Sequence, residues 1–581
     1  MMSSIQKGNT MNRKLLLTAA CTSLTMISGA ALGTQTNTYP DGVASQHELN
    51  MQDVARSMIN SLTPAEKEVI AQSGGIGSDA LNLSGFTWDQ DESRERRAVP
   101  EGSTATEFLE MLLGDEMRDE LSEQELTILY NIASVMDDGT EVPFFCFAPD
   151  TNPKYAMMVN DLLDYQFVST DGSRFQQGNR WSGTATDGGG LGQGDPTTIT
   201  YSFVPDGTSI PNTGLGSGNS TLFNWLDGRY GSTAVWQELF HGVFDRWAEI
   251  TGLTYVWEPN DDGRTLSSRS GQLGVRGDVR ISAFNYPFDG NNGVLAYNFF
   301  PNDGDMAIDA FDSFYNSTAG NSLRLRNVVA HEHGHGLGMA HVCPAIGTKL
   351  MEPFVSTGYD GPQLDDKLNG QRHYGDPLEP NDSIADATDL GIHDASSIAS
   401  VNEVSLDDNN DFDFFKLTLS ERARIIFAVS PNASTYQSGP QTQACNSGSN
   451  INYNAINDIQ VRLYSASDLV TPVATADDTG TGGSETIVYE SQAPGDYYLI
   501  VSPVTSVNNV QRYIASLITQ SLPPVVCPAD LTGDGVLNFF DVSAFLNAFG
   551  SMDPIADFTN DGQFNFFDVS AFLNAFSAGC P

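Results

Sequence analysis

Apolar and polar positions follow two different periods along the chain, and the period predicts where helices and strands form. Ser122 and Glu125 have the spacing of a capping box and open a predicted helix, whose apolar face holds Leu126, Leu129, Tyr130, Ala133 and Met136. A second helix is predicted to start at Ser232 or Thr233 and to end near Gly252. Its apolar stripe, which we interpret as core rather than as a binding face, consists of Trp236, Leu239, Phe240, Val243, Phe244, Trp247 and Ile250.

Strand-like alternation occurs on both sides of the second helix and then dominates the later part of the chain. Residues 199–203 alternate as in a half-buried strand, and residues 253–258 and 278–284 predict two further strands. Helices mixed with strands predict an α+β domain over residues 166–376. Short alternating segments separated by turn residues then predict an all-β sandwich over residues 377–522, with strands at 412–419, 424–429, 459–464, 497–501 and 513–518.

Length and charge limit the classes of protein that this chain can be. With 581 residues it is too long for one hydrophobic core, so several domains are expected. Asp and Glu number 73 against 28 Lys and Arg, which gives a formal net charge of −45. Such a surface repels phosphate groups, so we expect no nucleic-acid partner and no binding to anionic membranes. The acidity favours solubility, calcium binding by some of the carboxylates, or both.

The N-terminus has the pattern of an export signal over residues 1–33. Asn12-Arg13-Lys14 is a short basic start, residues 15–32 are apolar and small, and small residues surround the predicted cleavage point. Cys21 is a weak match to a lipoprotein site, so we favour a released protein, secreted or extracellular. No later segment is apolar enough to span a membrane. Residues 34–165 are then predicted to be a pro-segment or an N-terminal helical region.

One stretch, His-Glu-His-Gly-His-Gly-Leu-Gly-Met-Ala-His, has the spacing of a catalytic metal site. On a helix, His331 and His335 are four residues apart and face the same way, so both imidazoles can reach one metal ion. Gly338 can end the helix in a left-handed conformation, so that His341 returns as the third ligand. Three neutral nitrogen ligands leave one zinc position open for water, and Glu332 is placed to take a proton from that water. The alternative interpretation is a His-rich surface helix, which would not need Gly338 and His341 at these positions.

This motif resembles that of the metzincin zinc endopeptidases, and within them the chain is similar to the matrixins. Lys349-Leu350-Met351-Glu352-Pro353 resembles the family's Met-turn, which implies that Met351 lies beneath the zinc site. The resemblance also implies that an extended substrate peptide pairs antiparallel with an edge strand at about residues 294–299. The alternatives for three further acidic residues are the family's calcium ligands or an acidic loop surface: Asp289, Asp309 and Asp312.

The chain departs from the matrixin pattern at a second, structural zinc site. Matrixins commonly hold this zinc with three histidines. Tyr297 and Ala307 stand at two of those positions, and the loop that would carry the third is shortened. We therefore predict one zinc ion in the catalytic domain rather than two.

Cys146-Phe147-Ala148-Pro149-Asp150 resembles the matrixin pro-segment switch, in which a thiolate fills the open zinc position. The resemblance makes Cys146 a candidate thiol latch. The family's flanking Arg and Gly are replaced here by Phe145 and Phe147, so a buried cysteine in a Phe-rich core is the alternative.

Five cysteines remain after removal of the signal, so at least one is unpaired or bridges two chains. Cys527 and Cys580 flank a duplicated unit and are predicted to pair. The pairing of Cys343 and Cys445 stays open.

The predicted sandwich resembles the pre-peptidase C-terminal domain, an accessory module of secreted peptidases. The segments that carry this resemblance are Glu379-Pro380-Asn381-Asp382, Asp411-Phe412-Asp413-Phe414-Phe415 and Ala493-Pro494-Gly495-Asp496-Tyr497-Tyr498. The resemblance implies a β-rich domain that accompanies the catalytic one.

Residues 523–581 contain a duplicated acidic unit, which spans residues 530–541 and recurs at 557–568. Each copy has glycine at position 6 and oxygen donors at the positions that bind calcium in EF-hand loops. These donors are Asp530, Thr532, Asp534, Val536, Asn538 and Asp541, and Asp557, Thr559, Asp561, Gln563, Asn565 and Asp568. One helix follows each loop, so the unit resembles a type I dockerin, which implies two calcium ions and a cohesin-like partner. Attachment to a cell surface through this module stays open.

The sequence thus predicts a multidomain protein: an α+β metzincin catalytic domain, an all-β sandwich and a small α-helical calcium-loop pair. The leading hypothesis is a secreted zinc endopeptidase that cleaves protein or peptide substrates with Glu332 as base. A non-catalytic adhesion protein on the same scaffold is the second hypothesis, although the zinc ligands and Glu332 are all present. An enzyme of a polysaccharide-degrading complex is the third, because the resemblance to dockerins suggests such an assembly.

Overall fold

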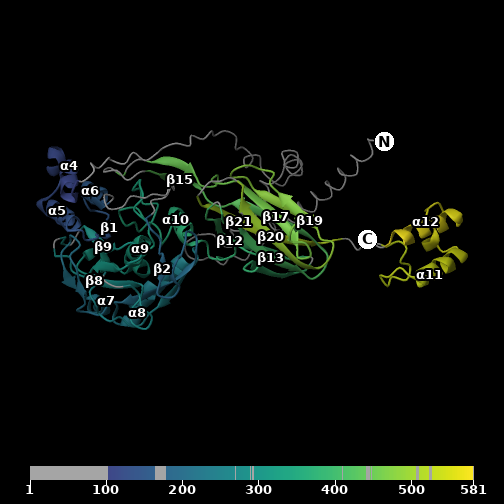
Figure 1. Ribbon diagram of the computed structural model, residues 1–581, viewed down its shortest axis with the longest axis horizontal. Coiled ribbons are helices and arrows are strands. Elements are labelled where there is room, and N and C mark those ends of the chain that lie inside the picture. The colour runs from purple at the N-terminus through teal and green to yellow at the C-terminus, as the bar shows by residue number, and fades with distance from the viewer. Residues whose placement is uncertain are drawn as a thin grey trace.

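The chain folds into three lobes in a row, which hold residues 103–376, 377–522 and 527–579 (Figure 1). The computed structural model describes residues 103–163, 178–267, 270–287, 289–290, 293–394, 396–408, 410–439, 445, 448–504, 509–522 and 527–579. The predicted export signal at 1–33 lies outside the described residues. Among the helices that are described, none combines the length and the apolar character needed to cross a membrane.

The first lobe is built on a six-stranded sheet with the strand order β1-β9-β10-β8-β4-β7. Its strands are β1 (Phe144–Phe147), β4 (Thr197–Phe203), β7 (Leu253–Trp257), β8 (Val279–Phe284), β9 (Val294–Asn298) and β10 (Met306–Asp309). Strands β4, β7, β8 and β10 are parallel, β9 is antiparallel to β10, and β1 is antiparallel to β9. The strands that the sequence predicts at 253–258 and 278–284 form as β7 and β8.

Strand β4 forms where alternation predicts it, but the expectation that it is half-buried is wrong. It lies between β7 and β8, and its polar residues Thr200 and Ser202 are buried together with its apolar ones. Thr200 Oγ1 donates a hydrogen bond to Asp278 Oδ2 (2.7 Å), and Ser202 Oγ donates one to Asp261 Oδ2 (2.8 Å). Because these hydroxyls have partners, the strand can be buried on both faces.

Four helices complete the core of the first lobe: α7 (Leu222–Tyr230), α8 (Thr233–Ala248), α9 (Ala319–Gly336) and α10 (Leu364–Tyr374). Every residue of the predicted apolar stripe on α8 is buried, so its interpretation as core is confirmed. The indole Nε1 of Trp247 donates a hydrogen bond to the carbonyl of Ala330 on α9 (3.3 Å). Helix α8 therefore fixes the helix that carries the histidine motif.

The N-terminal described region is helical, with α4 (Ala105–Arg118), α5 (Glu123–Asp137) and α6 (Pro153–Leu163). The capping box of Ser122 and Glu125 is present at the start of α5, as predicted. The buried face of α5 differs from the predicted one and consists of Ile128, Leu129, Ile132 and Ala133. Leu126, Tyr130 and Met136 are only partly buried, because the helix packs by a neighbouring face.

The second lobe consists of two sheets that share one apolar core. The first sheet has the order β11 (Thr388–His393), β13 (Asp413–Leu419), β20 (Gly495–Pro503), β17 (Ile459–Ser465) and β18 (Ala474–Ala476). The second has the order β12 (Ile398–Leu406), β21 (Gln511–Ser521), β14 (Ala423–Pro431) and β19 (Glu485–Glu490). All five strands that the sequence predicts are present, as β13, β14, β17, β20 and β21.

Short elements connect the larger ones. Three two-stranded pairs are β2 (Gly183–Thr184) with β3 (Gly188–Gly189), β5 (Ser209–Ile210) with β6 (Gly218–Asn219), and β15 (Thr435–Ser438) with β16 (Ser449–Asn452). Among the described residues, the 3₁₀ helices are η2 (Ser313–Asn316) and η3 (Pro554–Ala556).

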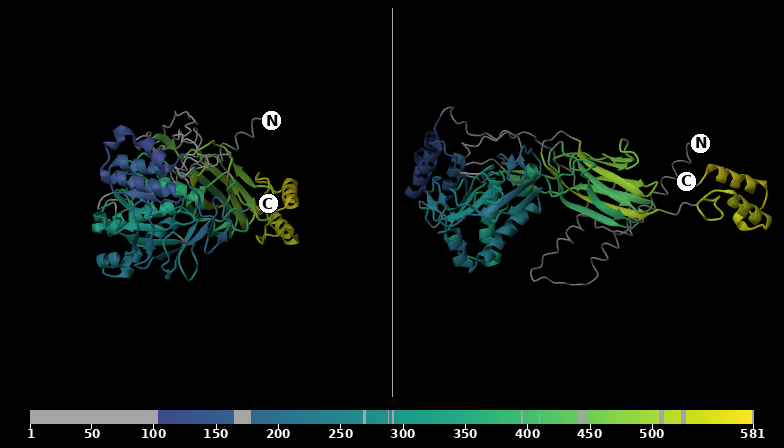
Figure 2. Two further views of the ribbon diagram at one scale, coloured as in Figure 1. Left: turned by 60° about the vertical axis from the view of Figure 1, so that its left-hand side comes forward. Right: turned by 60° about the horizontal axis from the view of Figure 1, so that its bottom comes forward.

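The first two lobes are joined covalently and by hydrogen bonds, and they lie against each other in the views of Figure 2. A disulfide links Cys343 to Cys445, a pairing that the sequence leaves open. Helix α10 contacts the sandwich through Gln371 Nε2, which donates to the carbonyl of Glu403 (2.8 Å). The α10 contacts and the disulfide therefore restrict the sandwich relative to the first lobe.

The third lobe is a pair of helices, α11 (Phe539–Gly550) and α12 (Phe566–Ala578). The rings of Phe545 and Phe572 stack with centroids 4.1 Å apart and form the centre of a small core. Cys527 is disulfide-bonded; Cys580, the partner that we predict, lies outside the described residues.

Replacing Cys343 and Cys445 by serine should lower the free energy of unfolding by about 2–4 kcal/mol, because the disulfide closes a loop with a sequence separation of 102. Thermal unfolding followed by circular dichroism would measure the change. Cys343→Ser alone should match the double variant, since either change removes the cross-link. An unchanged midpoint would contradict a stabilising role.

Candidate functional site

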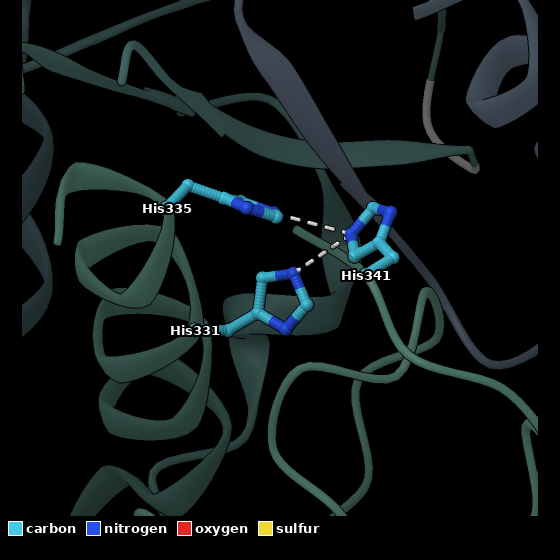
Figure 3. Close-up of side chains that lie close together, drawn as sticks. All are labelled: His331, His335 and His341. Carbon is cyan, nitrogen blue, oxygen red and sulfur yellow. Dashed lines mark hydrogen bonds between the residues drawn. The ribbon is translucent and has the colours of Figure 1, made fainter. Parts of the chain in front are cut away.

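The three motif histidines come from one helix and the turn that follows it. His331 and His335 lie on α9, and Gly338, with φ at +94°, lets the chain reverse toward His341. A Cβ atom at position 338 would lie 2.3 Å from the carbonyl oxygen of Asn179, so glycine is required there for space as well. Figure 3 shows the three side chains pointing toward one another.

The imidazoles meet through their Nε2 atoms. His341 Nε2 lies 3.1 Å from His331 Nε2 and 3.2 Å from His335 Nε2, as the dashed lines of Figure 3 mark. Each Nδ1 faces an oxygen acceptor instead. These acceptors are Leu350 O for His331 (2.6 Å), Met339 O for His335 (2.6 Å) and Asn160 Oδ1 for His341 (2.7 Å). Because Nδ1 carries the proton in such bonds, each Nε2 presents a lone pair.

This arrangement fits a zinc ion. Burial lowers the pKa of His331 to about 4 and the pKa values of His335 and His341 well below their usual range, so all three rings are neutral. Three converging lone pairs repel one another unless a cation lies between them. Tetrahedral zinc, with Zn–N bonds of about 2.0–2.1 Å, needs nitrogen ligands about 3.3–3.4 Å apart, which is near the observed spacing.

Glu332 lies next to this cluster and beside Cys146. Burial raises the pKa of Glu332 well above its usual range, and the contact with Cys146 opposes that rise. Burial, together with the charge of Glu332, raises the pKa of the Cys146 thiol. Within the described residues, the metal-ligand cluster around α9 contains the three histidines and not Cys146. The cysteine therefore neighbours the carboxylate rather than the three converging nitrogens.

Met351 packs against the histidine helix, where glycine leaves room for it. It is fully buried, and a Cβ atom at Gly334 would lie 2.3 Å from Met351 Sδ. Asp366 of α10, which the sequence does not single out, accepts hydrogen bonds from the N–H groups of Leu350 (2.8 Å) and Met351 (3.1 Å). Since the Leu350 carbonyl orients His331, Asp366 is a positioning residue for the site.

Strand β1 covers the edge of β9 that borders the histidines. It pairs antiparallel with β9 along its whole length. On its other side, Phe147 N–H donates to the carbonyl of Pro353 (3.0 Å), and Val355 N–H donates to the carbonyl of Phe147 (3.1 Å). Strand β1, an extended segment of this chain, thus lies beside residues 294–299. This is the edge with which, by the resemblance to matrixins, a substrate peptide is expected to pair.

Helix α6 and Phe144 of β1 also contact the histidines. Asn160 of α6 accepts the hydrogen bond from His341, and this contact was not foreseen because the two residues are 181 positions apart. The Phe144 ring lies 5.0 Å from the His335 ring and stacks on Phe300 at 4.6 Å. Residues 103–163 therefore form a cover over the cluster.

The acidic residues of the predicted calcium loop in the first lobe are buried together. Burial raises the pKa of Asp289 to about 8 and that of Asp309 to about 7, and Asp312 adds repulsion to both. Within the described part of the chain, they do not form a group whose ligand oxygens lie within 4.8 Å of one another. Tyr297 and Ala307, at the positions of the family's structural zinc ligands, are cross-strand partners on β9 and β10.

The two acidic loops of the third lobe have the same backbone turn. In both, the first aspartate accepts a hydrogen bond from the N–H of the position-6 glycine, at 2.7 and 2.8 Å. Asn538 and Asn565 cap the helices that follow. In the first loop, one oxygen each from Asp530, Asp534 and Asp541 lies within 4.8 Å of the others. Among the described residues, the second loop has no such group.

Solved structures similar to this chain match a minor part of it. The pre-peptidase C-terminal domain of a collagenase from Bacillus anthracis covers 23% of this chain and 94% of that one, at 15% identity and a TM-score of 0.15. A periplasmic lysozyme inhibitor from Aeromonas hydrophila covers 23% and 97%, at 12% identity and a TM-score of 0.15.

Residues 230–375 match the family model described as Matrixin. Stromelysin-3 of Xenopus laevis is 31% identical over 201 residues, which are 31% of this chain and 39% of that protein. Neutrophil collagenase of Homo sapiens is 48% identical over 113 residues, or 19% and 22% of the two chains. The chain thus spans less than two fifths of the length of these relatives. Residues 230–375, which contain the histidine cluster, are thus similar to the matrixins, a family of zinc metalloendopeptidases.

Proposed function

We propose that this protein is an exported zinc endopeptidase, held in a latent form by residues 103–163. The observation that carries the proposal is the convergence of three Nε2 lone pairs beside a buried carboxylate. His331, His335 and His341 would hold the zinc ion, which would polarise the scissile carbonyl and acidify a water molecule. The expected substrates are proteins and peptides, in keeping with the matrixin match.

Glu332 is the general base of this proposal. Its carboxylate is buried against Cys146, and this contact favours the ionised form. It can therefore accept a proton from the attacking water and then deliver it to the leaving amine. Met351 and Asp366 support the geometry by fixing the segment that orients His331.

Strand β1 supports a latent form because it has the hydrogen-bonding position of a substrate. A peptide that adds to the edge of β9 needs the same N–H and C=O groups that β1 now uses. Cys146 belongs to this strand and lies beside Glu332. In the proposed thiol latch, its thiolate would fill the open zinc position until the cover leaves. Removal of the cover would free both the sheet edge and the zinc position.

The remaining parts of the chain support a secreted enzyme that docks to a partner. The two acidic loops are proposed to bind one calcium ion each, in a dockerin-like module with a cohesin-like partner. Both repeats expose a pair of neighbouring aromatic rings, which supports a docking surface: Phe539, Phe540, Phe566 and Phe567 are 76%, 69%, 75% and 70% exposed. A calcium ion at Asp289, Asp309 and Asp312 stays a prediction.

Replacing Glu332 by glutamine should lower kcat/KM on casein by about 10²–10⁴-fold, because the general base is lost while the side-chain volume is kept. The activity assay needs protein from which residues 103–163 have been removed by controlled cleavage. Zinc content should equal that of the wild type. Retained activity in a zinc-loaded variant would reject Glu332 as the base.

Replacing His341 by alanine should abolish stoichiometric zinc, measured by elemental analysis after dialysis. His333→Gln is the matched control, since His333 is also buried on α9 but bonds to the Tyr255 hydroxyl (2.7 Å) and not to the cluster. The control should keep one zinc per chain. Equal zinc content in both variants would contradict the assigned ligands.

Phe147→Pro should raise the activity of the uncleaved chain by about tenfold, because proline cannot donate the hydrogen bond to Pro353 that helps to hold β1. Phe147→Leu keeps the N–H and the apolar bulk and should stay latent. Cleavage of a fluorogenic peptide measures both variants. If Phe147→Pro is as inactive as the wild type, β1 is not the block.

A further inference from the structure

Strand β1 lies in a groove with two walls, both of which fall within residues 230–375. One wall is β9, with which β1 pairs antiparallel. The other is the segment of Pro353 and Val355, which exchanges hydrogen bonds with Phe147 and runs parallel to β1 at this point. These bonds use main-chain groups that every extended peptide has, so they alone select no sequence.

The side chains that can select a sequence are aromatic rings along the groove. Each phenylalanine of β1 contacts one of these rings. The pairs are Phe144 with Phe300, Phe145 with Tyr297, and Phe147 with Phe354. Their ring centroids are 4.6, 6.1 and 6.2 Å apart, and the planes of the first pair differ by 5°. Aromatic pairs at such separations add stability beyond the burial of the rings, so the groove favours aromatic residues at three positions.

The position among these phenylalanines holds the short side chain of Cys146. This residue is fully buried and belongs to the core of the first lobe, together with Ala296 of β9 and Val329 of α9. Its thiol and its backbone N–H group also contact the carboxylate of Glu332. A small residue beside the proposed base therefore fits this position of the groove.

The groove rings would become accessible when residues 103–163 leave. Tyr297 and Phe300 are at most 3% exposed, and Phe354 is partly buried. All three belong to an apolar cluster that consists largely of residues of the cover, such as Leu129 and Met158. An apolar surface that is uncovered beside a catalytic site is suited to bind a substrate.

We propose that this groove selects extended peptides in which two aromatic residues precede a small residue and one aromatic residue follows it. Tyr297, Phe300 and Phe354 are then the residues that determine specificity, and β1 is a tethered peptide of the same class. The inference rests on the proposed function, since it names the substrate class of that site.

Alkylation of Cys146 in the intact chain measures how firmly β1 occupies the groove. Among the described residues Cys146 is the free cysteine, and its buried thiol reacts only when β1 opens. Phe144→Leu should raise the alkylation rate, measured by peptide mass mapping, about two- to tenfold because the stacked pair is lost. In a Phe300→Leu background the same change should have little further effect, because the partner ring is already absent.

Phe108→Leu is the matched control, since Phe108 is a buried phenylalanine on α4 of the same cover. It should change the alkylation rate by the same factor with and without Phe300→Leu. If Phe144→Leu also acts by equal factors in the two backgrounds, the groove does not recognise aromatic rings and the proposal is overturned.

A pair of peptides tests the substrate class independently of any change in β1. The enzyme activated as for the Glu332 measurement should have a KM about fivefold lower for a peptide with the core Phe-Phe-Ala-Phe than for one with Leu-Leu-Ala-Leu. Phe354→Leu should narrow this difference. Equal KM values in the wild type would overturn the proposal. Cleavage of neither peptide, together with coupled alkylation rates, would reject the proposed endopeptidase and still support the aromatic groove.

Discussion

Three neutral imidazoles that direct their lone pairs at one point are the constraint on which the first lobe depends. Such an arrangement is repulsive by itself, so each ring needs its Nδ1 proton fixed by an acceptor. The acceptors come from separate places: the Leu350 and Met339 carbonyls and the Asn160 side chain. Helix α6 carries Asn160, and Asp366 of α10 holds the Leu350 segment through its N–H group.

Helix α10 connects the histidine site to the sandwich. Near its start, Asp366 accepts a hydrogen bond from the N–H of Met351, and farther along the helix Gln371 donates one to the carbonyl of Glu403. The second lobe therefore contacts the same helix that holds the segment beneath the three histidines.

Local signals in the sequence were sufficient for the elements and for the motif. The i, i+4 histidines, the Ser122 capping box and the α8 stripe each depend on residues within one or two helical turns. Contacts between distant segments were not predictable, such as Asn160 with His341, 181 residues apart, or Cys343 with Cys445. Strand β4 was misjudged because alternation treats Thr200 as exposed, whereas Asp278 lets it be buried.

Strand β1 was also missed, although its position follows from a general property of sheets. An edge strand presents unpaired N–H and C=O groups, which bind any extended segment that reaches them. On β9 this edge borders the three histidines, so whatever occupies it lies at the metal position. One unsatisfied edge thus accounts for both proposed states of the enzyme, because the internal strand and an external peptide compete for the same hydrogen bonds.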